Sequence, residues 1–175
     1  MGIQETPRGE RFHIVFFGKR NAGKSSLLNA ITGQQTAIVS EVPGTTTDPV
    51  SKAMEILPIG PCMLVDTPGL DDEGELGKKR IKKTLQAMNT ADVGIVVVDI
   101  SELKDASLLS DRGLPKEETE LLSMLEARGI PCLLVLNQTD RLEVSEASDI
   151  RERLLHGNRR AEALEEPRKP ERETG

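Results

Sequence analysis

Continuous apolar runs alternate with segments of helical periodicity along the first 140 residues of the chain. Aliphatic and β-branched residues fill the runs, which favours buried strands at 12–17, 62–66, 93–98 and 131–136. Apolar residues at helical spacing predict helices over 25–32, 75–89 and 116–127. Strands that are apolar throughout are buried on both faces, as in a parallel sheet covered by helices. The pattern therefore predicts an α/β doubly wound fold.

One further strand, at residues 50–57, is expected to run in the opposite direction. The turn-forming sequence Pro58-Ile59-Gly60-Pro61 joins it to the strand at 62–66, so the two should form an antiparallel hairpin. The expected sheet is thus mostly parallel, with one antiparallel strand at its edge.

The two ends of the chain lack this alternation. Residues 1–11 are polar and charged, which predicts a short arm. After Asp140 about half of the residues are charged and no run of four apolar residues occurs. A short helix at 149–156, followed by disorder over 157–175, is expected there. The predicted organisation is an arm (1–11), a folded domain (12–140) and a charged tail (141–175).

Composition and charge exclude several functional classes. The formal net charge is −6 and the only aromatic residues are three phenylalanines, so nucleic acid would meet neither a basic footprint nor stacking platforms. No apolar segment approaches the ~20 residues that span a bilayer, and no apolar signal region begins the chain. A cytoplasmic location without membrane contact is therefore expected. Cys62 and Cys132 lie within apolar runs and should be core residues.

The first chemical motif lies between the strand at 12–17 and the helix that follows it. Its sequence, Gly18-Lys19-Arg20-Asn21-Ala22-Gly23-Lys24-Ser25, fits the Walker A pattern, although a glycine-rich turn without a ligand is the alternative. Glycines let such a loop turn its N–H groups toward phosphates, and the helix N-terminus adds partial positive charge. Lys24 is expected to reach the β- and γ-phosphates, and Ser25 to bind Mg²⁺. The predicted nucleotide-binding residues here are Gly18, Asn21, Ala22, Gly23, Lys24, Ser25 and Ser26.

Two further segments are candidates for the magnesium site. Asp66-Thr67-Pro68-Gly69 ends the strand at 62–66, where a carboxylate lies beside the phosphate loop and can hold a Mg²⁺-bound water. Gly69 is expected to turn its N–H toward the γ-phosphate. Gly44-Thr45-Thr46-Thr47-Asp48 lies in the long loop, where a threonine hydroxyl would complete the Mg²⁺ shell when triphosphate is bound. A threonine-rich surface loop is the alternative for that segment.

A third motif, Asn137-Gln138-Thr139-Asp140, directly follows the strand at 131–136 and resembles the Asn-Lys-x-Asp guanine reader of GTPases. Asp140 can accept hydrogen bonds from the ring N–H and the exocyclic amine of guanine. Adenine would leave this carboxylate unpaired, at a cost of about 1–3 kcal/mol. Gln138 replaces the lysine whose stem packs over the base, which predicts weaker binding with the guanine preference retained. A polar turn after a strand is the alternative.

Together the motifs resemble the Era/TrmE-like group of P-loop GTPases, which implies a Ras-like fold. Residues 18–30 and Val42-Pro43-Gly44-Thr45-Thr46-Thr47-Asp48-Pro49-Val50 are similar to the N-terminal GTPase domain of the FeFe-hydrogenase maturation GTPase. Lys52-Ala53-Met54-Glu55 and residues 66–77 are similar to it as well. Thr47, the third threonine before Asp48, and the following Pro49-Val50 distinguish this family from the ribosome-assembly and tRNA-modifying relatives, which usually carry arginine at that position. The resemblance covers residues 7 to about 140.

The resemblance implies a slow, Mg²⁺-dependent and K⁺-stimulated GTPase, the switch domain of a hydrogenase H-cluster maturation scaffold. Its ligands would be GTP and GDP, and its partners hydrogenase maturation proteins that contact the switch regions. Leu70 stands where Ras-like enzymes carry a water-positioning glutamine, so hydrolysis would proceed in another way. Asn21 would bind K⁺, which would do part of what an arginine finger does. The implied catalytic groups are Lys24, Thr46 and Gly69, and the implied Mg²⁺ ligands are Ser25, Thr46 and Asp66.

The chain departs from that family in two respects. Its two cysteines lie on expected core strands, so no iron–sulfur cluster is expected in this chain. A complete GTPase core has one more strand after the guanine reader, and no apolar run after Asp140 provides it. The last strand is therefore expected to be missing, as in a fragment or a truncated product. Two alternatives stay open: a ribosome-assembly or tRNA-modification GTPase, and a nucleotide-binding module with no useful catalysis, which Leu70 and Gln138 favour.

Overall fold

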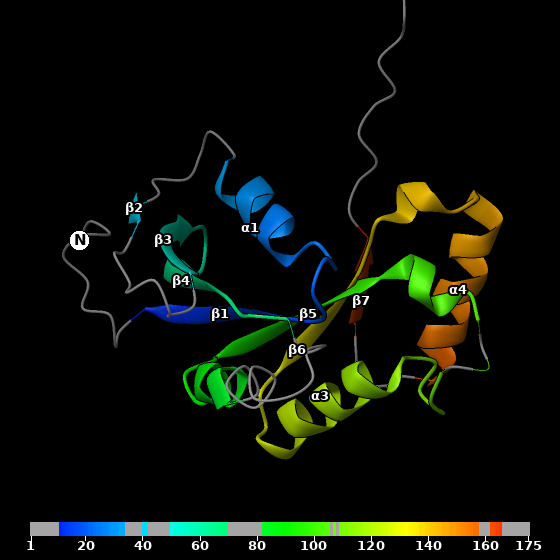
Figure 1. Ribbon diagram of the computed structural model, residues 1–175. Helices are drawn as coiled ribbons and strands as arrows, with labels where there is room; N and C mark the ends of the chain where they lie inside the picture. Colours follow the sequence, from blue (N-terminus) through cyan, green and yellow to red (C-terminus); the bar gives the residue numbers. More distant parts are fainter. Residues whose placement is uncertain are drawn as a thin grey trace, which may run out of the picture.

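A seven-stranded, mostly parallel sheet organises the fold (Figure 1). The computed structural model describes residues 11–33, 40–41, 50–69, 82–105, 107, 109–157 and 162–165. The strands are β1 (Phe12–Phe17), β2 (Ser40–Glu41), β3 (Val50–Ile56), β4 (Gly60–Asp66), β5 (Val93–Asp99), β6 (Cys132–Asn137) and β7 (Glu162–Glu165). Their order across the sheet is β2-β3-β4-β1-β5-β6-β7. Parallel pairing joins β4, β1, β5, β6 and β7, whereas β3 pairs antiparallel with both β2 and β4.

Helices cover both faces of this sheet. They are α1 (Lys24–Thr32), α3 (Lys116–Ala127) and α4 (Val144–Gly157), with short 3-10 turns η2 (Ile100–Leu103) and η4 (Thr139–Arg141). Residues 82–88 are helical as well. Alternate residues of β1 enter two separate cores: Val15 and Phe17 pack on the side of α3 and α4, and Ile14 and Phe16 on the side of α1. Figure 1 shows α1 and α3 on opposite faces, which confirms the doubly wound α/β fold.

The two cysteines occupy core positions, as expected. Cys62 is buried on β4, and Cys132 on β6 is partly buried against the core. Both are free thiols. Burial raises the pKa of each thiol above its ordinary value, so both are held in the neutral form that suits a packed interior.

The sheet differs from the expectation at both edges. The antiparallel strand β3 is not the outermost strand, because the two-residue strand β2 pairs beyond it. The expectation of a missing last strand is corrected by β7, which pairs in parallel with β6 from Leu133 opposite Glu162 to Leu136 opposite Glu165. An outer strand is held through backbone hydrogen bonds on one side, so it needs no continuous apolar run. The lack of an apolar run after Asp140 therefore does not exclude a last strand.

Residues 141–157 also differ from the expectation. Helix α4 begins at Val144 rather than near 149, because the Glu146 carboxylate accepts a 3.1 Å hydrogen bond from the backbone N–H of Glu143 and caps the helix. Ala147, Ile150 and Leu154 bury one face of α4 in the core shared with β1 and α3, so packing continues past the expected boundary at 140. Among the described residues, no helix combines the length and apolar character needed to cross a bilayer.

Candidate nucleotide-binding and catalytic site

The phosphate loop, Gly18 to Ser25, connects the carboxyl end of β1 to the start of α1. Its turns use left-handed backbone conformations at Gly18 (φ 139°), Asn21 (φ 62°) and Gly23 (φ 98°). A Cβ atom at Gly18 would lie 2.2 Å from the backbone carbonyl oxygen of Val97, so only glycine lets the loop cross β5 this closely. The geometry fits the predicted loop, in which successive backbone N–H groups surround an anion.

Lys24 is the charged group beneath this loop. Its side chain is buried, and its Nζ donates hydrogen bonds to the backbone carbonyl oxygens of Gly18 (3.0 Å) and Lys19 (2.6 Å). The ammonium is thereby held against the loop that would receive the phosphates. The first turn of α1 carries no acidic residue, so the partial positive charge of the helix N-terminus adds to that of Lys24.

Ser25 and Asp66 meet across the site, from α1 and from the carboxyl end of β4. The Ser25 hydroxyl donates a 2.5 Å hydrogen bond to Oδ2 of Asp66. The other carboxylate oxygen, Oδ1, is buried and has no hydrogen-bond partner within the described part of the chain. A hydroxyl and a carboxylate with a spare oxygen are the hard ligands that Mg²⁺ takes, so these two residues fit the ion.

The turn after β4 is fixed by Thr67. Its hydroxyl donates a 2.7 Å hydrogen bond to the backbone carbonyl of Phe16, which also accepts from the Thr67 N–H at 3.3 Å. Gly69, the predicted γ-phosphate donor, is partly buried at the end of this described segment. Thr46, the predicted third Mg²⁺ ligand, and Leu70 lie outside the described residues.

The predicted guanine reader follows β6 and contacts the phosphate loop directly. Asn137 is buried, and its Nδ2 donates a 2.9 Å hydrogen bond to the backbone carbonyl of Ala22. Gln138 adopts a left-handed conformation (φ 63°), and its Nε2 donates a 2.9 Å hydrogen bond to the backbone carbonyl of Asn21. Asp140 lies in η4 and is exposed. Asn137 therefore braces the loop, and Asp140 remains the candidate for reading guanine.

Asp99 is a site residue that the sequence analysis missed. It ends β5, and its Oδ1 accepts hydrogen bonds from the N–H (2.9 Å) and the hydroxyl (2.6 Å) of Ser101. Its Oδ2 accepts a 2.9 Å hydrogen bond from Arg141, the residue next to Asp140. Asp99 thus anchors η4 to the central sheet. A local signal existed, since an aspartate followed two residues later by serine is typical of a helix cap.

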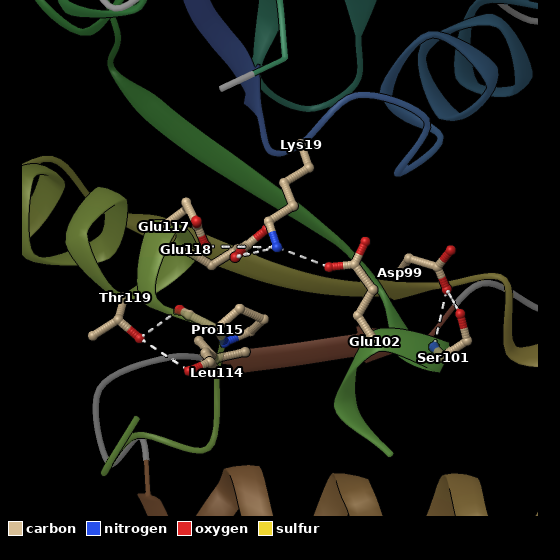
Figure 2. Close-up of polar contacts among 9 residues, drawn as sticks. All are labelled: Lys19, Asp99, Ser101, Glu102, Leu114, Pro115, Glu117, Glu118 and Thr119. Atoms are coloured by element: carbon tan, nitrogen blue, oxygen red, sulfur yellow. Dashed lines mark hydrogen bonds and ion pairs between the residues drawn. The ribbon is translucent and has the colours of Figure 1, made fainter. Parts of the chain in front are cut away.

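The role of Lys19 was also missed. The sequence placed this residue in the Walker A motif but assigned it no function of its own. Its Nζ lies 2.9 Å from Glu102, 3.6 Å from Glu117 and 3.6 Å from Glu118 (Figure 2). Burial alone would lower the pKa of Lys19, but the hydrogen bond with Glu102 and the nearby carboxylate charges raise it above its ordinary value. Burial raises the pKa of Glu118, against the effect of the Lys19 charge. No sequence pattern indicated this cluster, because its members come from three separate segments.

The fold thus brings most of the predicted site to one edge of the sheet. The phosphate loop, Asp66 and the Asn137–Asp140 turn all follow the carboxyl ends of parallel strands, where ligands bind in open α/β sheets. Ser26 and Asn21 are exposed in the same region, Asn21 on the loop itself. The arrangement can hold a nucleotide with its phosphates at α1 and its base beside η4.

Comparison with known proteins identifies the family. Residues 13–138 match the model of the 50S ribosome-binding GTPase family. The tRNA modification GTPase MnmE of Natranaerobius thermophilus is 34% identical over 142 residues, which cover 81% of this chain and 28% of MnmE. GTPase Der of Kosmotoga olearia is 31% identical over 138 residues, 76% of this chain and 29% of Der. The chain therefore spans less than a third of the length of these curated relatives.

Solved structures agree on the fold. Era of Aquifex aeolicus bound to GDP and AlF4⁻ superposes with a TM-score of 0.65 and 21% identity, over 87% of this chain and 50% of Era. Era in complex with MgGDPNP and nucleotides 1506–1542 of 16S ribosomal RNA superposes with a TM-score of 0.63 and 22% identity, over 88% of this chain and 50% of Era. With the family match over residues 13–138, these comparisons lead to one conclusion: this chain belongs to the 50S ribosome-binding GTPase family.

Proposed function

We propose that this GTPase domain is the nucleotide-driven switch of a larger tRNA-modification GTPase. The observation that supports this reading is the similarity to MnmE, at 32–38% identity over 75–86% of the chain in several bacteria. Thr47, Pro49 and Val50 are the residues that distinguish the hydrogenase maturation GTPase from these relatives, and Thr47 and Pro49 lie outside the described residues. The relatives therefore favour tRNA modification over hydrogenase maturation.

The chain's own residues divide the work of nucleotide binding. Gly18, Ala22, Gly23 and Ser26 would present backbone or hydroxyl donors to the phosphates, and Lys24 its ammonium to the β- and γ-phosphates. Asp140 would select guanine, while Asn137 holds the loop to the reader. Ser25, Asp66 and Thr46 would hold Mg²⁺. When bound, this ion neutralises charge that develops on the phosphates.

Hydrolysis is proposed to be slow and stimulated by K⁺. Leu70 has no group that can orient water, so this chain lacks the water-positioning glutamine that Ras-like enzymes carry at that position. Gly69 would donate its backbone N–H to the γ-phosphate, and Asn21, exposed on the phosphate loop, would provide an oxygen ligand for K⁺. Such a rate suits a switch that changes partner contacts once per nucleotide.

RNA contact is assigned to other parts of the larger protein. The formal net charge of this chain is −6, which opposes binding to a phosphate backbone. The Era structure with 16S ribosomal RNA concerns a chain of which this fold covers 50%, so it does not place RNA on this domain.

The binding and turnover part is tested with fluorescent mant-GTP and mant-GDP in Mg²⁺ buffer. We expect guanine-selective binding that excess ATP does not compete away, and phosphate release that is faster in K⁺ than in Na⁺. Asp140→Ala should lose about 1–3 kcal/mol of the preference for GTP over ATP. Binding without any phosphate release in either salt would leave only a nucleotide-binding module.

The tRNA-modification part is tested in a chimera in which residues 12–165 replace the matched segment of MnmE from Natranaerobius thermophilus. Mass spectrometry of tRNA nucleosides should show restored modification in cells that lack their own enzyme. A second chimera, built on a hydrogenase maturation GTPase, is assayed for hydrogenase activity. If both chimeras hydrolyse GTP but only the second restores its activity, the tRNA-modification proposal is wrong.

A further inference from the structure

Lys19 links three parts of the fold. Its backbone belongs to the phosphate loop, and its side chain reaches Glu102 on η2 and Glu117 and Glu118 in the first turn of α3 (Figure 2). The shortest of these contacts is a 2.9 Å hydrogen bond from Nζ to Oε2 of Glu102. The three carboxylates are 83 to 99 residues from Lys19 in the sequence, so only the folded sheet brings them together.

Burial makes this contact energetically significant. The Lys19 side chain is 18% exposed and that of Glu118 is 1% exposed, whereas Glu102 and Glu117 are about half exposed. Oε2 of Glu118 has no hydrogen-bond partner within the described residues. Burial disfavours the ionised form of Glu118, and the Lys19 ammonium at 3.6 Å partly offsets this cost.

The backbone of Lys19 carries this restraint to the site. Its carbonyl oxygen accepts the 2.6 Å hydrogen bond from Nζ of Lys24, the lysine assigned to the phosphates. The side chain of Lys19 is held by the carboxylates, and its carbonyl is held by Lys24. The first turn of the loop therefore has little conformational freedom. Such pre-organisation raises affinity, because less ordering remains to be done when the ligand binds.

We propose that Lys19 is a positioning residue for GTP binding: its ion pairs with Glu102 and Glu118 hold its carbonyl in place beneath Lys24 and tie the phosphate loop to α3. The inference rests on the assignment of Lys24 to the nucleotide phosphates. It also gives α3 a direct route to the site, since any displacement of its first turn moves the carboxylates that hold Lys19.

The chain offers a matched control for a merely structural role. Arg112 makes a bidentate pair with Glu126 at the other end of α3, with distances of 3.1 and 2.9 Å. Loss of the Arg112–Glu126 pair should loosen the packing of α3, and neither residue belongs to the phosphate loop. If the ion pairs act only through the stability of α3, both Lys19→Met and Arg112→Met should weaken nucleotide binding. If Lys19 positions Lys24, only Lys19→Met should weaken it.

The test measures the affinity of mant-GTP and mant-GDP in Mg²⁺ buffer for the wild type and for Lys19→Met, Lys19→Arg, Glu118→Gln, the Lys19→Met/Glu118→Gln double variant and Arg112→Met. We expect Lys19→Met to weaken mant-GTP binding about tenfold, which is within the range of couplings between contacting residues. Lys19→Arg should recover most of this loss, and the double variant should bind no more weakly than Lys19→Met. Equal losses in Lys19→Met and Arg112→Met, or wild-type affinity in Lys19→Met, would overturn the proposal.

Hydrogen exchange without nucleotide provides an independent measurement. The backbone amides of residues 18–25 should exchange faster in Lys19→Met than in the wild type, and at the wild-type rate in Arg112→Met. Unchanged exchange in Lys19→Met would contradict the positioning role even if nucleotide binding proved weak. A wild-type chain that bound no nucleotide, with faster exchange in Lys19→Met, would count against the proposed function and support the tie between Lys19 and the loop.

Discussion

The side-chain amide of Asn137 lies 2.9 Å from the backbone carbonyl oxygen of Ala22 and donates a hydrogen bond to it, although 115 residues separate the two. The approach is so close that a Cβ atom at Gly23 would lie 1.9 Å from Nδ2 of Asn137. The backbone N–H of Gln138 holds the other end of this amide through a 2.8 Å hydrogen bond to Oδ1. The phosphate loop and the guanine reader therefore form one unit, and damage to either should affect both.

Replacing Asn137 tests this coupling. Asn137→Ala leaves the buried carbonyl of Ala22 without its partner, which should lower the free energy of unfolding by about 1–3 kcal/mol. Affinity for mant-GDP should fall as well, because the loop loses its brace. Chemical denaturation and fluorescence titration measure the two effects. Asn89→Ala removes an exposed amide and serves as the control. If Asn137→Ala changes stability and affinity no more than Asn89→Ala does, the hydrogen bond to Ala22 has no energetic role.

Gly18 allows a second, steric test. In Gly18→Ala the new Cβ would lie 2.2 Å from the Val97 carbonyl oxygen, and the backbone must move to relieve this clash. We therefore expect the free energy of unfolding to fall by about 3 kcal/mol or more. Gly129→Ala is the matched variant, since Gly129 also has a positive φ (67°) but nothing within 4 Å of a Cβ. It should cost only about 1–2 kcal/mol of backbone strain. Thermal or urea unfolding distinguishes the two, and equal losses would contradict the close approach.

Much of the fold could be predicted because its signals are local. The continuous apolar runs at β1, β5 and β6 and the periodicity of α3 placed these elements to within one or two residues. The motifs at 18–25, 66–69 and 137–140 follow strand ends, and parallel pairing alone brings such ends to one edge. Strand β7 was missed because an edge strand is held by its backbone, which leaves little trace in the sequence.

The side-chain contacts within the site could not be predicted in this way. Asp99 pairs with Arg141 across 42 residues, and Lys19 with Glu102 across 83. Such pairs depend on which strand ends lie side by side, and on the left-handed turns at Asn21 and Gln138 that set where side chains point. Periodicity and composition carry no information on either. The motif placed Asn137 among the nucleotide-binding residues, but it gave no sign that the Asn137 amide also bonds the Ala22 carbonyl and the Gln138 N–H.

Gln138 offers a gain-of-affinity test. Its Nε2 donates to the backbone carbonyl of Asn21 at 2.9 Å, and a lysine ammonium at this position would make a charge-assisted bond while its stem packs over the base. We expect Gln138→Lys to bind mant-GDP about three- to tenfold more tightly, with the preference over ATP unchanged. Gln86→Lys places the same charge on an exposed helical position and should leave affinity as it is. Equal affinities in both variants would mean that glutamine already makes the full contact.

The pH dependence of stability should reveal Glu118. Burial raises the pKa of this carboxyl above the ordinary value of 4.5, and the charge of Lys19 only partly offsets the shift. At pH values between 4.5 and the raised pKa, the folded chain binds more protons at Glu118 than the unfolded chain does. Its contribution to stability is thus fully present below about pH 4.5 and is lost as the pH rises through the raised pKa.

Glu118→Gln removes this contribution while keeping the shape of the side chain. The melting temperature of the variant relative to the wild type should therefore increase as the pH rises from about 4 to 7. Glu117→Gln removes a half-exposed carboxylate beside the same lysine and should give a much flatter difference across this range. If the two differences had the same slope, burial of Glu118 would not be the cause, and the link between Lys19 and α3 would be weaker than the contacts imply.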